Sequence, residues 1–301
     1  MAATLFNVLG VSEEEIVEMI NRKSKFYVSY SISKKSGKPR HIDAPIGNLK
    51  TWQKQILKNI LNKFSASQIA HGFVKGRSPL TNAERHVGAK ILIKVDIANF
   101  FNNISQQQVF DALKTFLNKY YPIITLTNNN LDLLYLSELL TYKRRIPQGA
   151  PTSPCLTNLI CLGMDRDLIK LSNKYNCVIT RYADDITISS NQDIPINNIL
   201  SSINHILKKF NFTMRWAKTK VCTKAHCMQV TGIVVNEKIN IKRSQYRNLR
   251  AQLHQLSKNK IKITKNDFEI LRGKVEWIRT LNQNKAFSLT EQLSKMTFQT
   301  T

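Results

Sequence analysis

Stretches with helical periodicity alternate along this chain with short apolar runs that are typical of buried strands. The clearest amphipathic helix is predicted at residues 196–210, where apolar residues recur every three or four positions. Further helices are predicted at residues 13–22 and 131–142, around an apolar stripe from Trp52 to Phe64, and after capping residues at Ser105 and Ser153. Strand-like runs occupy residues 26–45, 91–96 and 178–189. This mixture predicts an α+β protein.

The last part of the chain, from Lys238 onward, combines helical periodicity with a strong positive charge. Helices are expected around residues 243–257 and 267–282, and the segment carries 14 Lys and Arg residues against four Asp and Glu. Lys-rich helices often have only a solvated charged face. The bias toward one sign favours a phosphate-binding surface instead. The candidate contacts are Lys242, Arg243, Arg247 and Arg250.

The whole chain of 301 residues has a formal net charge of +25. Such an excess indicates a polyanionic partner, and nucleic acid is favoured over a membrane surface because no run of 18 apolar residues occurs. The N-terminus lacks a signal peptide, and the five cysteines form no CxxC pair. We therefore expect a cytoplasmic protein that does not associate with membranes.

An acidic pair lies between two strand-like runs, in the sequence Tyr182-Ala183-Asp184-Asp185. Asp96 closes another strand-like run and is expected at the exposed edge of the same sheet. The pair could be a polar hairpin turn and nothing more. Three carboxylates together would instead suit Mg²⁺, and two such ions are the usual device for attack of a hydroxyl on a phosphate. Zinc is disfavoured because no His or Cys cluster has metal-ligand spacing.

Four motifs in fixed order carry a family resemblance. Asp96 is followed by Phe100-Phe101, then by Pro147-Gln148-Gly149, and then by the acidic pair after Tyr182. This order resembles a reverse transcriptase. Two further strings, Asn82-Ala83-Glu84-Arg85-His86 and Val230-Thr231-Gly232, resemble hallmarks of bacterial retron reverse transcriptases. The resemblance covers residues 25–240.

The resemblance implies a right-hand polymerase with fingers, an antiparallel-sheet palm and a helical thumb. The N-terminal helix and fingers would be residues 1–90. The palm would be residues 91–236, with a fingers contribution around 120–150, and the basic helical thumb would be residues 237–301.

It also implies roles at the catalytic centre. Asp96 and Asp184 would hold two Mg²⁺ ions, for which Mn²⁺ is a possible substitute, with the Ile97 carbonyl as a further ligand. Asp185 would lie close by and be less central. Tyr182 would support the primer end. Lys218 resembles the Lys that protonates departing pyrophosphate, although the nearby Lys220 leaves that assignment open.

The incoming deoxynucleotide would meet residues from three segments. Phe101 would pack under its sugar and exclude a 2′-hydroxyl, with Phe100 as the alternative gate. Gln148 and Gly149 would contact the nucleotide from their turn. The fingers would clamp the triphosphate with Lys38 and Arg40.

The retron hallmarks extend the expectation to the substrate. The template would be a cognate structured non-coding RNA, primed from a 2′-hydroxyl to give branched RNA–DNA (msDNA), in antiphage defence with a separate effector protein. Recognition of the RNA is assigned by resemblance to Asn82, His86, Thr231 and Gly232, without a physical derivation. Two alternatives are a reverse transcriptase of another bacterial class and an RNA-binding scaffold that restrains an effector.

Overall fold

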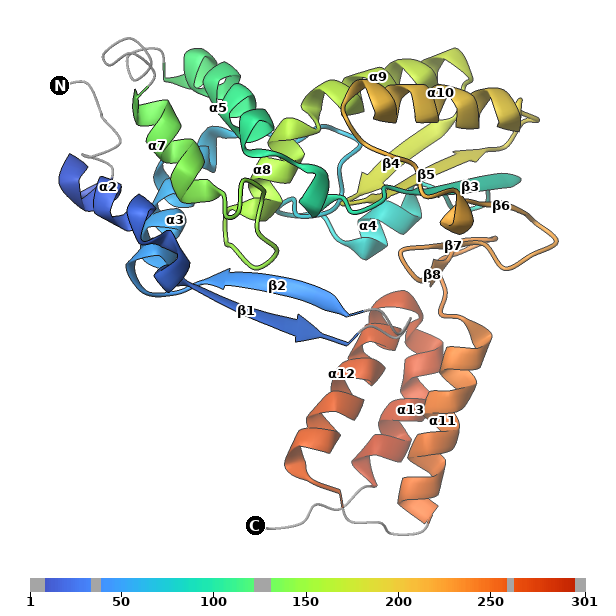
Figure 1. Cartoon of the computed structure of the whole chain (residues 1–301). Helices are drawn as coiled ribbons and strands as arrows, with labels where there is room; N and C mark the ends of the chain where they lie inside the picture. The colour runs from blue at the N-terminus through green and yellow to red at the C-terminus, as the bar shows by residue number, and fades with distance from the viewer. Residues whose placement is uncertain (1–8, 34–38, 122–130, 259–262, 296–301) are drawn as a thin grey trace.

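A computed structural model of the chain describes residues 9–33, 39–121, 131–258 and 263–295 (Figure 1). An N-terminal part contains helices and a β-hairpin, a central antiparallel sheet carries helices on its faces, and a bundle of three helices ends the chain. Figure 1 shows the bundle below the rest of the molecule, with the N-terminal hairpin reaching out above it. The predicted α+β class is confirmed.

The N-terminal part is formed by segments that precede and follow the first strand of the central sheet in the sequence. Its elements are α2 (Glu13–Asn21), η1 (Lys23–Phe26), β1 (Tyr27–Ile32), β2 (Arg40–Pro45), α3 (Gly47–Asn59), η2 (Leu61–Lys63), α5 (Gln106–Tyr120) and α7 (Leu131–Leu140). The predicted capping boxes of α2 and α5, at Ser12 and Ser105, are both present. Strands β1 and β2 pair antiparallel with Ile32 opposite Arg40. The turn expected before Arg40 falls mainly on residues 34–38, outside the described residues.

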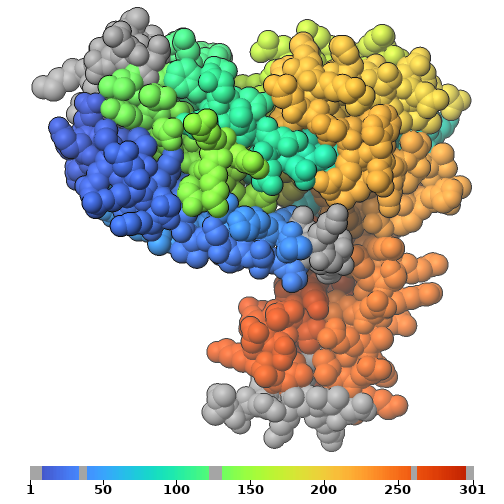
Figure 2. Space-filling model, in the orientation of Figure 1, coloured from blue at the N-terminus to red at the C-terminus, as the bar shows by residue number. Residues whose placement is uncertain are grey.

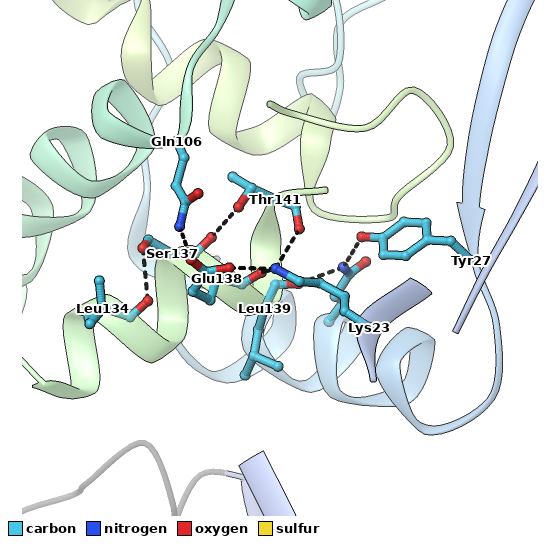
Figure 3. Close-up of polar contacts among 9 residues, drawn as sticks. Lys23, Tyr27, Gln106, Leu134, Ser137, Glu138, Leu139 and Thr141 are labelled. Carbon is cyan, nitrogen blue, oxygen red and sulfur yellow. Dashed lines mark hydrogen bonds and ion pairs between the residues drawn. The ribbon is translucent and has the colours of Figure 1, made fainter. Parts of the chain in front are cut away.

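One lysine holds the root of this hairpin to α7. The Lys23 ammonium donates to the carboxylate and the carbonyl of Glu138, at 2.6 and 2.7 Å, and to the carbonyl of Thr141 at 3.3 Å. Figure 3 shows Gln106 reaching the same carboxylate from α5. Because Lys23 lies in the short turn just before β1, its hydrogen bonds to α7 fix the direction in which the hairpin leaves the helices.

The central sheet has the strand order β4-β5-β3-β6, with neighbours antiparallel. Its elements, with the helices and turns beside it, are α4 (Pro79–Glu84), β3 (Ile91–Asp96), η3 (Phe101–Asn103), α8 (Ser153–Ile160), α9 (Leu162–Lys174), β4 (Val178–Tyr182), β5 (Asp185–Ser190), α10 (Ile196–Lys209), η4 (Trp216–Lys218) and β6 (Lys220–Thr223). Figure 1 shows α9 and α10 above the sheet and α4 below it. The expectation that Ser153 caps α8 is wrong. Ser153 is the first residue of that helix, and its hydroxyl donates to the Pro147 carbonyl at 2.7 Å.

The C-terminal elements are β7 (Gln229–Val230), β8 (Ile233–Val234), α11 (Arg243–Lys258), α12 (Lys265–Leu281) and α13 (Gln283–Ser294). The last three form the C-terminal bundle. The two predicted helices are confirmed as α11 and α12, and α13 was not predicted. Asn282 alone separates α12 from α13 and caps α13 by accepting from the Lys285 amide.

The buried apolar residues form two clusters. The larger one fills the N-terminal part and one face of the sheet. The smaller one fills the C-terminal bundle and also includes Ala83 of α4, Leu92 of β3 and residues of β7–β8. Figure 2 shows the corresponding two masses, with the bundle as the lower one. Within the described ranges, no helix is long and apolar enough to cross a membrane.

Candidate active site

The sheet register brings the three predicted aspartates together. Asp96, the last residue of β3, stands opposite Asp185, the first residue of β5. The Ile97 amide donates to the Asp184 carbonyl at 2.9 Å, which ties the end of β3 to the turn. Ala183, at the tip of this turn, has a φ of +56°. Three carboxylates from two neighbouring strands thus lie at one end of the sheet.

Two basic side chains approach Asp96. The Lys218 ammonium lies 2.8 Å from Oδ2 of Asp96, and a guanidinium nitrogen of Arg215 lies 3.3 Å from Oδ1. Asp96 is only 7% exposed, so the expectation of an exposed aspartate is wrong. The segment after α10 folds back beside β3 and covers it. Lys218 rather than Lys220 meets the carboxylates, because Lys220 lies in β6 opposite Lys94.

Burial and crowding disfavour negative charge here. Burial, the largest cause, raises the pKa of both Asp184 and Asp185, and repulsion from Asp96 adds to the rise. The charges of Lys218 and Arg40 oppose the rise at Asp184, which also places Arg40 within electrostatic range of the turn. The carboxylates therefore need compensating positive charge.

The donor chemistry at this end of the sheet fits a hard cation, because all three side chains offer carboxylate oxygens. Oδ1 of Asp96 is buried and accepts no hydrogen bond from the described residues. No three His, Cys, Asp or Glu side chains of the described ranges are gathered closely enough to form a ready-made metal site. Lys218 and Arg215 lie where a cation would compensate Asp96.

The predicted nucleotide contacts lie on the neighbouring turn and hairpin. The Gln148 carbonyl accepts from the Asp43 amide of β2 at 2.8 Å. Gly149 has a φ of +130°, and a Cβ there would lie 2.9 Å from the Asp43 carbonyl oxygen. Gly149 was expected to permit close approach of the nucleotide. It permits close approach of strand β2 instead. Arg40 begins this strand, and Lys38 lies outside the described residues.

The two adjacent phenylalanines differ in environment. Phe100 is 3% exposed and packs against Phe212, with ring centroids 5.4 Å apart. Phe101 is half-buried and meets the ring of Phe73 edge-on at 6.2 Å. Both residues lie beyond the strand, since Phe101 begins η3. The more open position of Phe101 favours it as the predicted sugar gate.

A buried ion pair that was not predicted from the sequence lies under the turn. The guanidinium of Arg181, in β4, binds both carboxylate oxygens of Asp165 in α9 at 2.7 Å, and both side chains are fully buried. Arg181 also donates to Asn158 and to the carbonyl of Ala183. Asn158 in turn donates to the carbonyl of Gly72 at 3.0 Å.

Gly72 completes this support from the other side. A Cβ on Gly72 would lie 2.5 Å from the Ala183 amide nitrogen, so only glycine permits the approach. The left-handed tip of the turn that carries Asp184 and Asp185 is thus enclosed by Gly72 and Arg181. The sequence signal for this support was Arg181, a charged residue within an apolar strand.

Asn82 and His86 do not face the solvent. Each is 1% exposed, and His86 accepts and donates within the protein, 2.7 Å from the hydroxyls of both Ser189 and Thr180. Asn82 lies inside α4, whose cap is Ser78. Direct contact of these two side chains with RNA, the role assigned to them by resemblance, does not fit their burial.

Thr231 and Gly232 form the two-residue turn between β7 and β8, with φ values of +48° and +84°. The hydroxyl of Thr231 donates to the Pro79 carbonyl of α4. Of the four basic residues predicted for the thumb, Lys242 lies just before α11 and Arg243 begins it. Arg247 and Arg250 lie about one and two turns further on. Tyr182 lies beside the acidic pair, since it pairs with Asp185.

The chain matches a known family over most of its length. The family model of reverse transcriptases (RNA-dependent DNA polymerases) matches residues 32–235. The Retron Mx65 reverse transcriptase of Myxococcus xanthus is 30% identical over 97% of this chain and 70% of its own length. The chain belongs to the retron reverse transcriptases. The predicted family and enzyme class, an RNA-directed DNA polymerase, are therefore confirmed.

Other relatives agree, and they differ from this chain in length. The Retron Mx162 reverse transcriptase of Myxococcus xanthus is 31% identical over 90% of this chain, which spans 61% of that protein. The Retron Ec86 reverse transcriptase of Escherichia coli is 29% identical over 95% of this chain and 86% of its own length. These retron enzymes match far more of this chain than the four motifs alone.

Comparison with solved structures shows which known fold the chain resembles. Telomerase from Candida albicans, in complex with a TWJ fragment of telomeric RNA, superposes with a TM-score of 0.52 at 13% identity, over 93% of this chain and 59% of that one. Telomerase from Candida tropicalis gives 0.53 at 12% identity, over 95% and 58%. The predicted right-hand polymerase fold is confirmed by this likeness.

Proposed function

We propose that this retron reverse transcriptase copies a cognate structured non-coding RNA into DNA, starting from a 2′-hydroxyl of that RNA, so that the product is branched RNA–DNA (msDNA). The observation that carries the polymerase activity is the meeting of Asp96, Asp184 and Asp185 at one end of an antiparallel sheet, with Lys218 and Arg40 in electrostatic range. Family membership supports the RNA template. The same resemblance supports a separate effector protein and a role in antiphage defence.

The parts of a polymerase hand follow sequence ranges, so α5 of the N-terminal part falls in the palm range and α4, beside the sheet, falls in the fingers range. We assign the fingers to residues 1–90 with a contribution from 120–150, the palm to residues 91–236 and the thumb to residues 237–301. Lys23 anchors the fingers hairpin, which carries Arg40 toward the carboxylates. The basic start of α11 supplies the thumb with cations for phosphates.

Asp96 and Asp184 would hold two Mg²⁺ ions, or Mn²⁺ in their place, with Asp185 and the Ile97 carbonyl beside them. Such ions lower the pKa of the attacking hydroxyl and neutralise the triphosphate. Lys218 compensates Asp96 in the free protein. With cations bound to Asp96 in its place, the Lys218 ammonium would be free to donate a proton to the leaving pyrophosphate.

The other residues bind and select the nucleotide. Arg40, with Lys38 before it, binds the triphosphate. Gln148 contacts the nucleotide from a turn that Gly149 allows to pack against β2. Phe101 leaves neither space nor a hydrogen-bond partner for a 2′-hydroxyl. Tyr182 supports the primer end next to Asp185.

The test is the nucleic acid that co-purifies with the chain expressed beside its own flanking DNA. We expect one RNA joined to one DNA through a 2′–5′ branch, which a debranching enzyme separates. The Asp184→Asn protein, as matched control, should carry the RNA without DNA. Linear DNA alone, or DNA on the Asp184→Asn protein, would contradict the proposal.

A further inference from the structure

The two retron hallmark segments, far apart in the sequence, are joined in the fold. The Thr231 hydroxyl, in the β7–β8 turn, donates to the Pro79 carbonyl at the start of α4, at 2.9 Å. The amide of Gly88 donates to the Val235 carbonyl, also at 2.9 Å. Residues 78–90 and 228–235 therefore form one unit, which we call the joint.

One side of the joint belongs to the core of the C-terminal bundle. Ala83, Val230 and Ile233 are fully buried in the cluster that includes Leu253 of α11 and Val275 of α12. Figure 1 shows β7 and β8 between the sheet and the bundle. A displacement of the bundle must therefore move the joint or open this core.

The opposite side of the joint is attached to the catalytic hairpin. His86 bridges two strands, with Nε2 2.7 Å from Oγ1 of Thr180 in β4 and Nδ1 2.7 Å from Oγ of Ser189 in β5. Burial lowers the pKa of His86 to about 3, so the ring is neutral and offers one donor and one acceptor. Both of its nitrogens are therefore used within the protein.

This attachment acts at one edge of the sheet. In the strand order, β4 is an edge strand, and its free edge is met only by the short stretch Ile69–His71 among the described residues. Thr180 and Ser189 each lie four residues from the carboxylates, at Asp184 and Asp185 respectively. His86 thus fixes the middle of β4 to the end of β5 away from the turn, and the two strands carry this constraint along the hairpin to the acidic pair.

We propose that the joint transmits the position of the C-terminal bundle to the catalytic hairpin, and that His86 is a positioning residue that touches neither metal nor nucleic acid. The inference rests on the proposed function of Asp184 and Asp185. It gives the hallmark segments a mechanical role that agrees with their burial. A turn misplaced by about 1 Å can cost a reaction roughly 100-fold in rate.

The test removes the partners of His86 and keeps the histidine. Thr180→Val and Ser189→Ala are made singly and together, and Ser190→Ala is the matched control. The Ser190 hydroxyl is on the same strand as Ser189, and its hydrogen bonds within the described part of the chain are to Gln192 of the following loop. Thr231→Ala loosens the joint from the bundle side.

Three properties of the full chain are measured well below each melting temperature. They are the single-turnover rate on a DNA primer annealed to RNA at saturating nucleotide and Mg²⁺, the affinity for Mn²⁺ by electron paramagnetic resonance, and the affinity for the duplex. In the double variant we expect the rate to fall about 10- to 100-fold and Mn²⁺ to bind at least about fivefold more weakly. Duplex affinity should stay within about twofold, as should every property of the control.

Thr231→Ala should lower the same two properties, by less. Unchanged rate and Mn²⁺ affinity in folded variants would overturn the proposal. So would loss of duplex affinity alone, because that result assigns the joint to direct RNA contact. Failure of the wild-type chain to extend any primer would reject the proposed function instead, and Mn²⁺ binding would still decide the role of His86.

Discussion

Replacing Asp165 by Asn should be among the most destabilising single changes to the sheet. Arg181 would keep its charge, with no exposure to water, and would be deprived of the carboxylate that binds it at 2.7 Å through both oxygens. Breaking a buried pair in this way costs about 3–5 kcal/mol. The matched control is Asp167→Asn, on the same helix, whose ion pair with Lys209 is at the surface and should contribute at most about 1 kcal/mol.

Urea denaturation of the wild type and the two variants measures these free energies of unfolding. A second arm separates stability from position. Replacing the pair by Asp165→Leu with Arg181→Met should restore most of the stability, because buried ion pairs are often replaced by apolar residues without a penalty. DNA synthesis should remain impaired, since the Ala183 carbonyl and Asn158 are both left without the guanidinium donor. An Asp165→Asn cost no larger than that of Asp167→Asn would refute the reasoning, as would full activity in the double variant.

The nucleotide site, the buried histidine and the bundle each give a further prediction. Phe101→Ala should admit ribonucleotides more than Phe100→Ala does, measured as ribonucleotide against deoxynucleotide incorporation; the reverse order would move the gate to Phe100. The fold lowers the pKa of His86 to about 3, so between pH 7 and pH 5 only the unfolded chain takes up a proton at this residue. The free energy of unfolding of the wild type should therefore fall over this range by about 2 kcal/mol more than that of His86→Leu. Equal falls would show that His86 is not buried and neutral. The third change neutralises four basic residues of the bundle together, Lys242, Arg243, Arg247 and Arg250. It should reduce the slope of log affinity against log salt by about 0.9 for each duplex DNA phosphate that is no longer neutralised. An unaltered slope would mean that these side chains are only solvated.

The helices and the order of the catalytic motifs were predictable because both depend on local patterns. The capping box at Ser12 and the periodicity of residues 196–210 determine their helices within a few positions. Helix α13 was missed because its pattern follows α12 after one residue, with no Pro or Gly to mark a boundary.

The support of the site was not predictable in the same way, because it depends on contacts between distant segments. Gly72 lies against Ala183, and Arg215 lies beside Asp96, although each pair is more than a hundred residues apart. The buried ion pair of Arg181 was an exception, because the sequence pattern of β4 could have indicated it. A charged residue in a buried strand requires a buried partner, although the sequence does not say that Asp165 is that partner.

The most direct test of the polymerase assignment is addition of one deoxynucleotide to a DNA primer annealed to RNA, in Mg²⁺, by the wild-type and Asp184→Asn proteins. Asp193→Asn, the same change on an exposed loop after β5, is the control. The wild type and the control should extend the primer, and Asp184→Asn should be slower by at least about 100-fold at an unchanged melting temperature. Extension by Asp184→Asn at the wild-type rate would contradict the account.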